Sequence, residues 1–280
     1  MYFKTEEGSI YYEASGPRNA PAVVFTHGGG LNGDMFKSQV RALKDQYRVV
    51  TWDLQGHGRS AALNDNLDVP KMAECLVGII DEVGIEEAVL VGQSLGVYVS
   101  QHAALKYPRR VKAHVSIGGL PVEKPMSKVV LYGFRVLMSI SRLFPEKILF
   151  KRTAREKATT KEAQDFFYSS LQQMGKEQFL LMLAGQLDAC TIRVPGPPTQ
   201  PLFIVHGEHE MPKSLVKANK EWHRSVPGSR YLEIPGAGHN ANMDKPEVFN
   251  RELLDFLEEV WGTERDTAGD YISYSLENWA

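Results

Sequence analysis

The pattern Gly-x-Ser-x-Gly around Ser94 is the part of this sequence that most directly suggests chemistry. Ser94 stands between Gly92 and Gly96, shortly after the apolar run 89–91. This order predicts a short strand, a sharp turn and the start of a helix, and such a turn projects the serine hydroxyl away from the backbone. The flanking glycines leave room for the turn because they carry no β-carbon. The N–H of Leu95 then falls in the first helical turn, where it has no partner within the helix and can donate to a developing oxyanion.

A serine hydroxyl needs partners before it can act as a nucleophile near neutral pH. It requires a base that takes its proton, and histidine suits this role because its ordinary pKa lies near neutrality. A carboxylate must then orient the imidazole and stabilise its positive charge. The order of residues along the chain fits this arrangement. Ser94 comes first, a carboxylate follows the next-to-last predicted strand, and His239 comes last.

Two other motifs suggest different chemistry on first inspection. The run Gly28-Gly29-Gly30 has the composition of a phosphate-binding loop, but no lysine follows it at the required spacing. His206 and His209 stand close to Glu208 and Glu210, yet their spacing matches no metal-binding motif. We therefore expect neither a metal ion nor an organic cofactor.

Strands that alternate with helices must position these residues. Apolar runs that are typical of strands lie at 9–14, 21–27, 47–53, 89–92, 111–117, 201–206 and 230–234. Helical segments cover 35–43, 70–83, 95–107, 212–226 and 246–260. The alternation predicts an α/β fold with a mostly parallel central sheet and helices on both faces. Functional residues of such sheets lie beyond the carboxyl ends of the strands. We therefore expect four segments at one edge of the sheet, namely the loop 27–30, Ser94, the loop 208–210 and His239.

The alternation stops between 120 and 198, where the sequence predicts helices only. We interpret 120–198 as a helical cap inserted into a core formed by 1–119 and 199–262, followed by a polar C-terminal tail at 263–280. The predicted cap helices cover 129–144, 153–174 and 177–189. The proline-rich stretch 193–198 then closes the insertion as a stiff linker.

The predicted helix at 129–144 is apolar on more than one face. One interpretation is that its apolar side chains form the core of the cap. A second is that one face roofs an apolar pocket that receives a hydrophobic acyl or ring group. A third is a contact with a membrane surface or with a second copy of the chain.

Composition narrows the class of protein. The 280 residues include 32 Lys and Arg and 34 Asp and Glu, a formal net charge of -2 that does not suggest a nucleic acid as partner. The first residues lack the pattern of a signal peptide, and no run of about 20 apolar residues predicts a membrane span. Cys75 and Cys190 lie in apolar, helix-like segments, so we expect two buried free thiols and a cytoplasmic location. The expected partner is a small-molecule substrate, and the oligomeric state is open, a homodimer being one option.

Four motifs are spread over 21–260 in a fixed order. They are His27-Gly28-Gly29, the stretch 53–60 with the pattern Asp-x-x-Gly-His-Gly-x-Ser, Gly92-Gln93-Ser94-Leu95-Gly96, and Gly236-Ala237-Gly238-His239. In this order they resemble the α/β-hydrolase superfamily, in its capped branch of small esterase-, lactonase- and peroxidase-like enzymes. The resemblance covers nearly the whole chain and implies the α/β-hydrolase fold with an inserted helical cap.

The resemblance also implies a role for each matching residue. Ser94 is the expected nucleophile and His239 the expected base, and the backbone N–H groups of Gly29 and Leu95 are the expected oxyanion hole. The family usually places an aspartate in a Gly-x-x-Asp pattern after the penultimate strand. This chain has Glu210 at that position, which makes it the expected acid of a Ser-His-Glu triad. Two other carboxylates remain alternatives, Glu208 and Asp244.

The sequence therefore predicts a serine hydrolase that cleaves a small, apolar carboxylic ester or lactone through an acyl-enzyme. One alternative is hydrolysis of a carbon–carbon bond in a diketone-type substrate, for which the same triad serves. A second is a non-enzymatic small-molecule sensor on the same fold, which the departure at Glu210 from the family's aspartate keeps open. A dehalogenase or an epoxide hydrolase is disfavoured, since those relatives carry an aspartate at the position of Ser94.

Overall fold

The central sheet positions the rest of the molecule. The computed structural model describes residues 1–124, 128–192, 194 and 196–262. Within these residues eight strands form one sheet: β1 (Tyr2–Thr5), β2 (Gly8–Ser15), β3 (Ala22–Thr26), β4 (Arg48–Trp52), β5 (Ala88–Gln93), β6 (Val111–Ile117), β7 (Leu202–Gly207) and β8 (Arg230–Ile234). Their order across the sheet is β1-β2-β4-β3-β5-β6-β7-β8. Strands β3 to β8 pair in parallel, and β1 and β2 form an antiparallel edge. The predicted α/β fold class with a mostly parallel sheet is confirmed.

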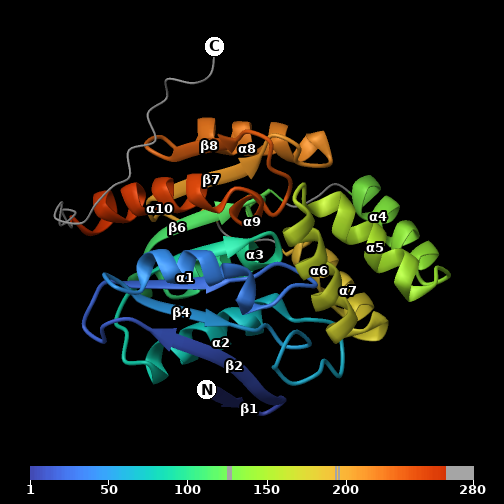
Figure 1. Ribbon diagram of the computed structural model, residues 1–280, viewed down its shortest axis with the longest axis horizontal. Helices are drawn as coiled ribbons and strands as arrows, with labels where there is room; N and C mark the ends of the chain where they lie inside the picture. The colour runs from blue at the N-terminus through green and yellow to red at the C-terminus, as the bar shows by residue number, and fades with distance from the viewer. Residues whose placement is uncertain (125–127, 193, 195, 263–280) are drawn as a thin grey trace.

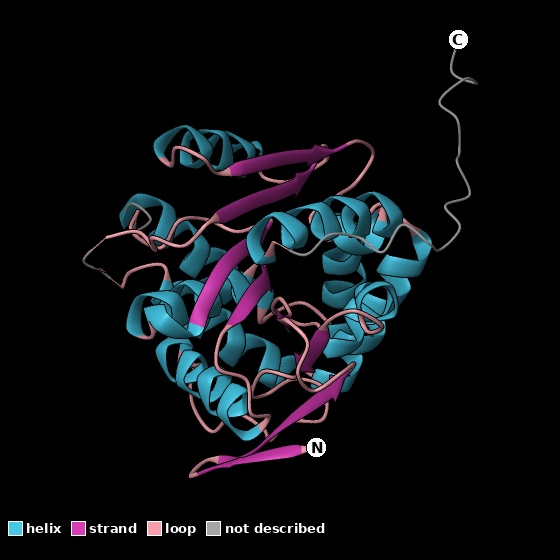
Figure 2. Cartoon of the chain, turned by 90° about the vertical axis from the view of Figure 1, so that its left-hand side faces the viewer, coloured by secondary structure: helices cyan, strands magenta, loops and turns pink. Residues whose placement is uncertain are grey.

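Helices cover both faces of this sheet, as Figures 1 and 2 show. The α-helices are α1 (Lys37–Leu43), α2 (Val69–Glu82), α3 (Leu95–Lys106), α4 (Lys128–Ser141), α5 (Glu146–Lys157), α6 (Lys161–Met174), α7 (Lys176–Ala189), α8 (Lys213–Ser225), α9 (Ala241–Asp244) and α10 (Pro246–Trp261). Two short 3-10 helices are η1 (Gly33–Phe36) and η2 (Pro108–Arg110). Helix α2 packs against α3, and α1 packs against α10.

The inner strands are apolar along their whole length. In β3 and β5 every residue is buried, including the runs Val23–Phe25 and Val89–Val91. A strand points successive side chains to opposite faces, so a continuous apolar run is stable only where helices cover both faces. Burial of each such side chain contributes about 1.5–3 kcal/mol, which fixes these strands at the centre of the sheet.

The register of the parallel strands brings their carboxyl ends to one edge. Thr26 at the end of β3 lies opposite Gly92 in β5, and Gln93 lies opposite Ile117 at the end of β6. Gly207 at the end of β7 lies opposite Ile234 at the end of β8 in the same way. The loops that follow these strands therefore begin side by side, although more than two hundred residues of chain separate the first from the last.

Helices α4 to α7 follow one another between β6 and β7 and gather on one side of the molecule (Figure 1), at the end toward which the arrows of β7 and β8 point. The division into a core, a cap at 120–198 and a tail remains a prediction. The predicted tail at 263–280 lies outside the described residues, as do Arg193 and Pro195 of the predicted linker.

One helix of the sequence analysis is two helices in the structure. The expected helix at 153–174 is interrupted, because α5 ends at Lys157 and α6 begins at Lys161. The side chain of Thr160 accepts the N–H of Ala163 and so caps α6. The N–H groups of Thr159 and Thr160 are bound by a carboxylate far along the chain, which holds them outside a helix.

Two further expectations concern the cysteines and the membrane. Cys75 and Cys190 are both buried free thiols, as predicted. None of the helices in the described ranges is long and apolar enough to cross a lipid bilayer.

Candidate active site

Ser94 lies on a strained turn between β5 and α3. Its φ of 51° makes it the one non-glycine residue with positive φ in the described part of the chain, and its ψ is -110°. Such a conformation costs about 1–3 kcal/mol and is found where it serves a function. A β-carbon on Gly92 would lie 2.5 Å from the carbonyl oxygen of Gly96, and one on Gly96 would lie 2.1 Å from that of Thr26. The glycines of the motif are therefore required by the crowding of backbone around Ser94.

Glu210 and His239 meet across the ends of β7 and β8. The ring nitrogen Nδ1 of His239 lies 2.8 Å from Oε1 of Glu210, and both residues are buried. Nδ1 carries the hydrogen in this contact, since the carboxylate can only accept. The Nε2 of a neutral imidazole is then left with its lone pair as the basic site. Of the three carboxylates proposed from the sequence, Glu210 is the one that contacts the imidazole, whereas Glu208 accepts the N–H of Gly236 at 2.9 Å.

Opposing effects act on the ionisation of Glu210. Burial raises its pKa, since the charged form loses hydration. The pKa of Glu210 is lowered by the charge of protonated His239 and by the hydrogen bond with that ring. The ammonium of Lys157 and the N–H of Met211 lower it further, so that the pKa of Glu210 lies below its ordinary value. Burial lowers the pKa of Lys157 itself, while the charges of Glu210 and Glu156 oppose that effect. The environment of Glu210 thus favours the ionised carboxylate.

Gln93 joins the turn at Ser94 to the loop that carries the histidine. Its side chain is fully buried, and its Nε2 donates to the carbonyl oxygen of His239 at 3.2 Å and to Oδ1 of Asn240 at 3.1 Å. On its other side, a β-carbon on Gly28 would lie 1.9 Å from Oε1 of Gln93. Gln93 is one of the variable positions in the Gly-x-Ser-x-Gly pattern, so the pattern alone does not predict this role.

The loop after β3 presents backbone N–H groups beside this turn. Neither the N–H of Gly29 nor that of Leu95 donates a hydrogen bond to another described residue. His27 fixes the loop, because its Nδ1 donates to the carbonyl oxygen of Gly28 at 2.8 Å and its Nε2 accepts the N–H of Leu54 at 2.9 Å. Burial lowers the pKa of His27, so the ring stays neutral in this role.

Apolar side chains from α6 and α7 lie directly over that loop. A β-carbon on Gly29 would lie 2.6 Å from the sulfur of Met182, and one on Gly30 would lie 2.6 Å from Leu171 and 3.0 Å from Phe167. All three side chains are buried. From the sequence, the helix at 129–144 is the candidate roof. These three residues do not stand out there, because their apolar periodicity is equally typical of helix packing.

The turn of Ser94 and the ring of His239 both lie beside the end of β6. The peptide of Ile117–Gly118 lies between their elements, since the N–H of Ser94 donates to Ile117 and a β-carbon on Gly118 would lie 2.9 Å from Nδ1 of His239. Within the described residues, the hydroxyl of Ser94 makes no hydrogen bond with His239. Catalytic hydrogen bonds are often longer without substrate and shorten in the complex.

The chain matches a known protein family over most of its length. Residues 21–246 match the family model described as "alpha/beta hydrolase fold". The chain belongs to the α/β-hydrolase family. The resemblance inferred from the four sequence motifs is thereby confirmed.

Three similar proteins illustrate the range of this family. The chain is 43% identical over 88 residues to the 3-oxoadipate enol-lactonase 1 of Acinetobacter baylyi, a match that spans 31% of this chain and 33% of that protein. It is 29% identical over 252 residues to a Klebsiella pneumoniae protein named "Putative carbamate hydrolase RutD", a match that spans 85% of this chain and 91% of the relative. A thermophilic esterase from Thermogutta terrifontis superposes with a TM-score of 0.78 at 22% identity, over 90% of this chain and 94% of the esterase, and this likeness shows the fold.

A carboxylate in this α/β hydrolase ties the α5–α6 turn to the histidine loop. Asp244 is buried and accepts the N–H of Gly238 at 2.8 Å, just before His239. It also accepts the N–H groups of Thr159 and Thr160 at 3.0 and 2.9 Å, together with the hydroxyl of Thr160 at 3.0 Å. Asp244 was one alternative for the triad acid, but in the structure it binds backbone donors and does not contact the imidazole.

Replacement of Asp244 should therefore destabilise the fold. We expect Asp244→Ala to lower the free energy of unfolding by about 2–4 kcal/mol, since it leaves buried N–H groups without an acceptor. Urea denaturation followed by circular dichroism measures this change. The matched control is Asp188→Ala, which removes a half-exposed carboxylate from α7 and should change the stability by less than about 0.5 kcal/mol. Equal stability of the two variants would show that the Asp244 contacts contribute nothing.

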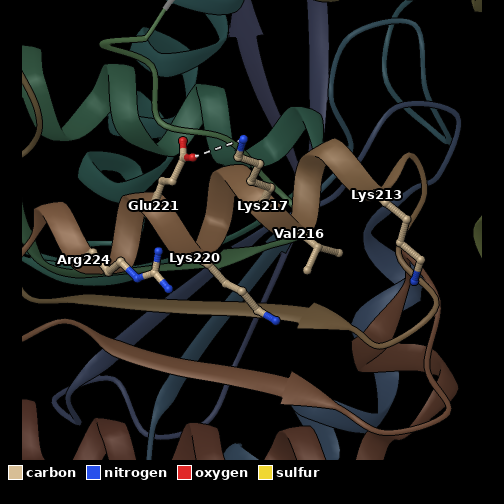
Figure 3. Close-up of a pocket in the computed structure, with 6 residues that line it drawn as sticks. All are labelled: Lys213, Val216, Lys217, Lys220, Glu221 and Arg224. Atoms are coloured by element: carbon tan, nitrogen blue, oxygen red, sulfur yellow. Dashed lines mark ion pairs between the residues drawn. The ribbon is translucent and has the colours of Figure 1, made fainter.

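A surface pocket on α8 lies apart from these residues. It is lined by Lys213, Val216, Lys217, Lys220, Glu221 and Arg224. Figure 3 shows these side chains projecting from one helix, with Lys217 and Glu221 paired at 3.9 Å. Neither Ser94 nor Glu210 nor His239 lines this pocket, so it is not where the predicted chemistry would take place.

Proposed function

We propose that this α/β hydrolase is a serine hydrolase that cleaves a small, apolar carboxylic ester or lactone. The observation that carries the proposal is the 2.8 Å contact between Nδ1 of His239 and Oε1 of Glu210. It supplies an oriented imidazole at the sheet edge where the strained turn presents Ser94. The names of two similar proteins, an enol-lactonase and an esterase, agree with this class of substrate.

The proposed reaction has two halves. The hydroxyl of Ser94 attacks the substrate carbonyl carbon while Nε2 of His239 takes its proton, and Glu210 stabilises the imidazolium that results. The N–H groups of Gly29 and Leu95 donate to the oxyanion of the tetrahedral intermediate. The carbon–oxygen bond then breaks, and His239 gives its proton to the leaving alkoxide, which leaves an acyl group on Ser94. In a lactone the alcohol and the acyl group remain one molecule.

Hydrolysis of the acyl group repeats these steps with water. His239 takes a proton from the water as it attacks the acyl carbon, and the same two N–H groups hold the second oxyanion. Collapse of this intermediate returns the proton to Ser94 and releases a carboxylic acid. The mechanism uses no metal ion and no organic cofactor. Within the described residues, no group of three His, Cys, Asp or Glu side chains is placed to hold a metal ion.

The apolar roof supports the proposed preference for apolar substrates. Phe167, Leu171 and Met182 lie over the loop that carries Gly29 and Gly30. These buried side chains exclude water from the loop, so a substrate group beside them would gain about 25 cal/mol for each square ångström of its own apolar surface removed from water. We further propose that 120–198 forms a cap above the core. A cytoplasmic location is also proposed, because two buried free thiols fit a reducing compartment.

A substrate panel tests this proposal. We expect turnover of p-nitrophenyl esters and five-membered lactones, with kcat/KM rising by about tenfold as an ester chain lengthens by two methylenes. Phenyl carbamates and ring-cleavage diketones complete the panel, since a relative carries the name carbamate hydrolase and the same triad can cleave carbon–carbon bonds. Turnover of only carbamates or diketones would contradict the ester assignment. No turnover of any member by the folded protein would favour a sensor.

A further inference from the structure

Helix α4 turns an apolar face away from the protein. Val129 and Leu143, just beyond the end of the helix, are exposed by 82% and 83%, and Tyr132 by 71%. Val136 and Ile140 lie between them and are 40% and 45% exposed. Residues that repeat every seven positions share one side of a helix. The run Val129, Val136 and Leu143 has this spacing, so its members face outward together.

The opposite side of α4 accounts for its packing on the protein. Leu131 is buried, Met138 is partly buried against the core, and the two residues are also seven positions apart. Helix α4 packs against α7. Helix α4 is therefore apolar on both sides, but only its inward side is covered by the rest of the protein. Soluble monomers rarely expose a contiguous apolar surface unless it serves a contact.

Basic residues are concentrated in the segment that carries the exposed face. The stretch 129–155, which comprises most of α4 and α5, contains six basic residues and one acidic residue, in a chain whose formal net charge is -2. The basic residues are Arg135, Arg142, Lys147, Lys151, Arg152 and Arg155. Two of them have carboxylate partners, since Arg135 pairs with Asp188 at 3.9 Å and Arg152 with Glu156 at 2.7 Å. Ile148 of α5 and Phe144 before it continue the exposed apolar surface, at 56% and 42%. Apolar side chains bordered by lysines and arginines are typical of helices that bind at a membrane surface.

We propose that the α4–α5 surface, defined as the exposed apolar residues of 129–148 with the basic residues of 129–155, binds to the surface of an anionic lipid membrane. The apolar side chains would enter the headgroup region, and the cations would lie among the lipid phosphates. Charge argues against a second copy of the chain as the occupant, since each surface carries an excess of positive charge and two such surfaces would repel each other. Figure 1 places α4 and α5 at the outer end of the molecule, so no part of the described protein stands between them and a membrane.

Vesicle flotation tests this proposal without reference to catalysis. The protein is the full chain with Ser94→Ala, so that lipid hydrolysis cannot alter the vesicles. The vesicles are phosphatidylcholine alone and phosphatidylcholine mixed with phosphatidylglycerol, at low and at physiological salt. We expect flotation with the anionic vesicles, and a binding constant that falls as salt screens the charges.

Two sets of variants separate the apolar and the ionic contributions. We expect Val129→Glu with Leu143→Glu to lower the binding constant at least about tenfold. Lys147→Gln with Lys151→Gln should lower it about tenfold on anionic vesicles and leave binding to phosphatidylcholine unchanged. The matched control is Tyr2→Glu, which places the same charge at a half-exposed aromatic residue on β1 and should bind as the parent does.

Three results would overturn the proposal. The first is a parent protein that stays with the unbound fraction at low salt. The second is a Val129→Glu and Leu143→Glu variant that floats as well as the parent. The third is sedimentation of a dimer that this double variant dissociates, with no vesicle binding, which would assign the surface to a contact between copies. Because each of these is measured with the inactive chain, failure here leaves the proposed hydrolase activity untouched.

Discussion

Ser94→Ala should lower kcat for any ester or lactone substrate by about five to six orders of magnitude. The substitution removes the only atom proposed to form a bond with the substrate, while the turn, the imidazole and the N–H groups stay in place. The folded state should not lose stability, since the hydroxyl of Ser94 makes no hydrogen bond with another described residue. Initial rates with a p-nitrophenyl ester, measured beside urea denaturation, give both quantities.

Ser100→Ala is the matched control for that variant. Ser100 lies on α3, the helix that follows Ser94, and its hydroxyl is buried without a hydrogen-bond partner in the described structure. Removing it should change kcat by less than about twofold. Turnover by Ser94→Ala above about 1% of the parent would mean that another group is the nucleophile, and the proposed mechanism would be wrong.

Glu210→Gln should lower kcat by about four orders of magnitude. The amide preserves the shape of the side chain but removes the charge that stabilises protonated His239. Its NH2 group also turns toward Nδ1, which moves the ring hydrogen to Nε2 and leaves no lone pair facing Ser94. The matched control is Glu208→Gln, whose carboxylate is exposed and accepts the N–H of Gly236. That variant should keep kcat within about threefold.

The same substitution has an expected effect on stability that depends on pH. The folded-state pKa of Glu210 is lowered, so the ionised group stabilises the fold above its unfolded-state pKa. This contribution is lost as the pH falls through the folded-state value. The urea midpoint of the parent should therefore fall between about pH 6 and pH 3 by more than that of Glu210→Gln. The role given to Glu210 would be contradicted if the urea midpoints of the parent and the variant changed with pH in parallel and the variant kept full activity.

Much of the sheet edge could be predicted from the sequence. The glycines around Ser94 and the apolar run before it follow from local physics, because a strand that enters a crowded turn needs residues without a β-carbon. The parallel order then brings the ends of β5, β7 and β8 together without further information. The contact of His239 with Glu210 could not be derived in this way, since Glu208 stands two residues away and only the path of the loop decides between them.

The roles that could not be predicted from the sequence depend on long-range contacts. Asp244 binds Thr159 and Thr160 across 85 and 84 positions, and Gln93 reaches His239 across 146. A side-chain carboxylate or amide that forms hydrogen bonds with distant backbone groups leaves no periodic pattern in the sequence. The break between α5 and α6 has the same origin, because the threonines that end the helix are held from another part of the chain. The packing of Met182 over the loop after β3 could not be predicted for a related reason, since contacts between helices leave no specific pattern in the sequence.

The central claim is that the hydroxyl of Ser94 is activated, and covalent labelling measures this most directly. The parent protein, Ser94→Ala and Glu210→Gln are each incubated with a fluorophosphonate, and their intact masses are recorded over time. We expect one adduct on the parent, none on Ser94→Ala, and labelling of Glu210→Gln slowed by about a hundredfold or more. A parent that is folded by circular dichroism and takes up no label, or a Ser94→Ala variant that is labelled as fast as the parent, would contradict the account.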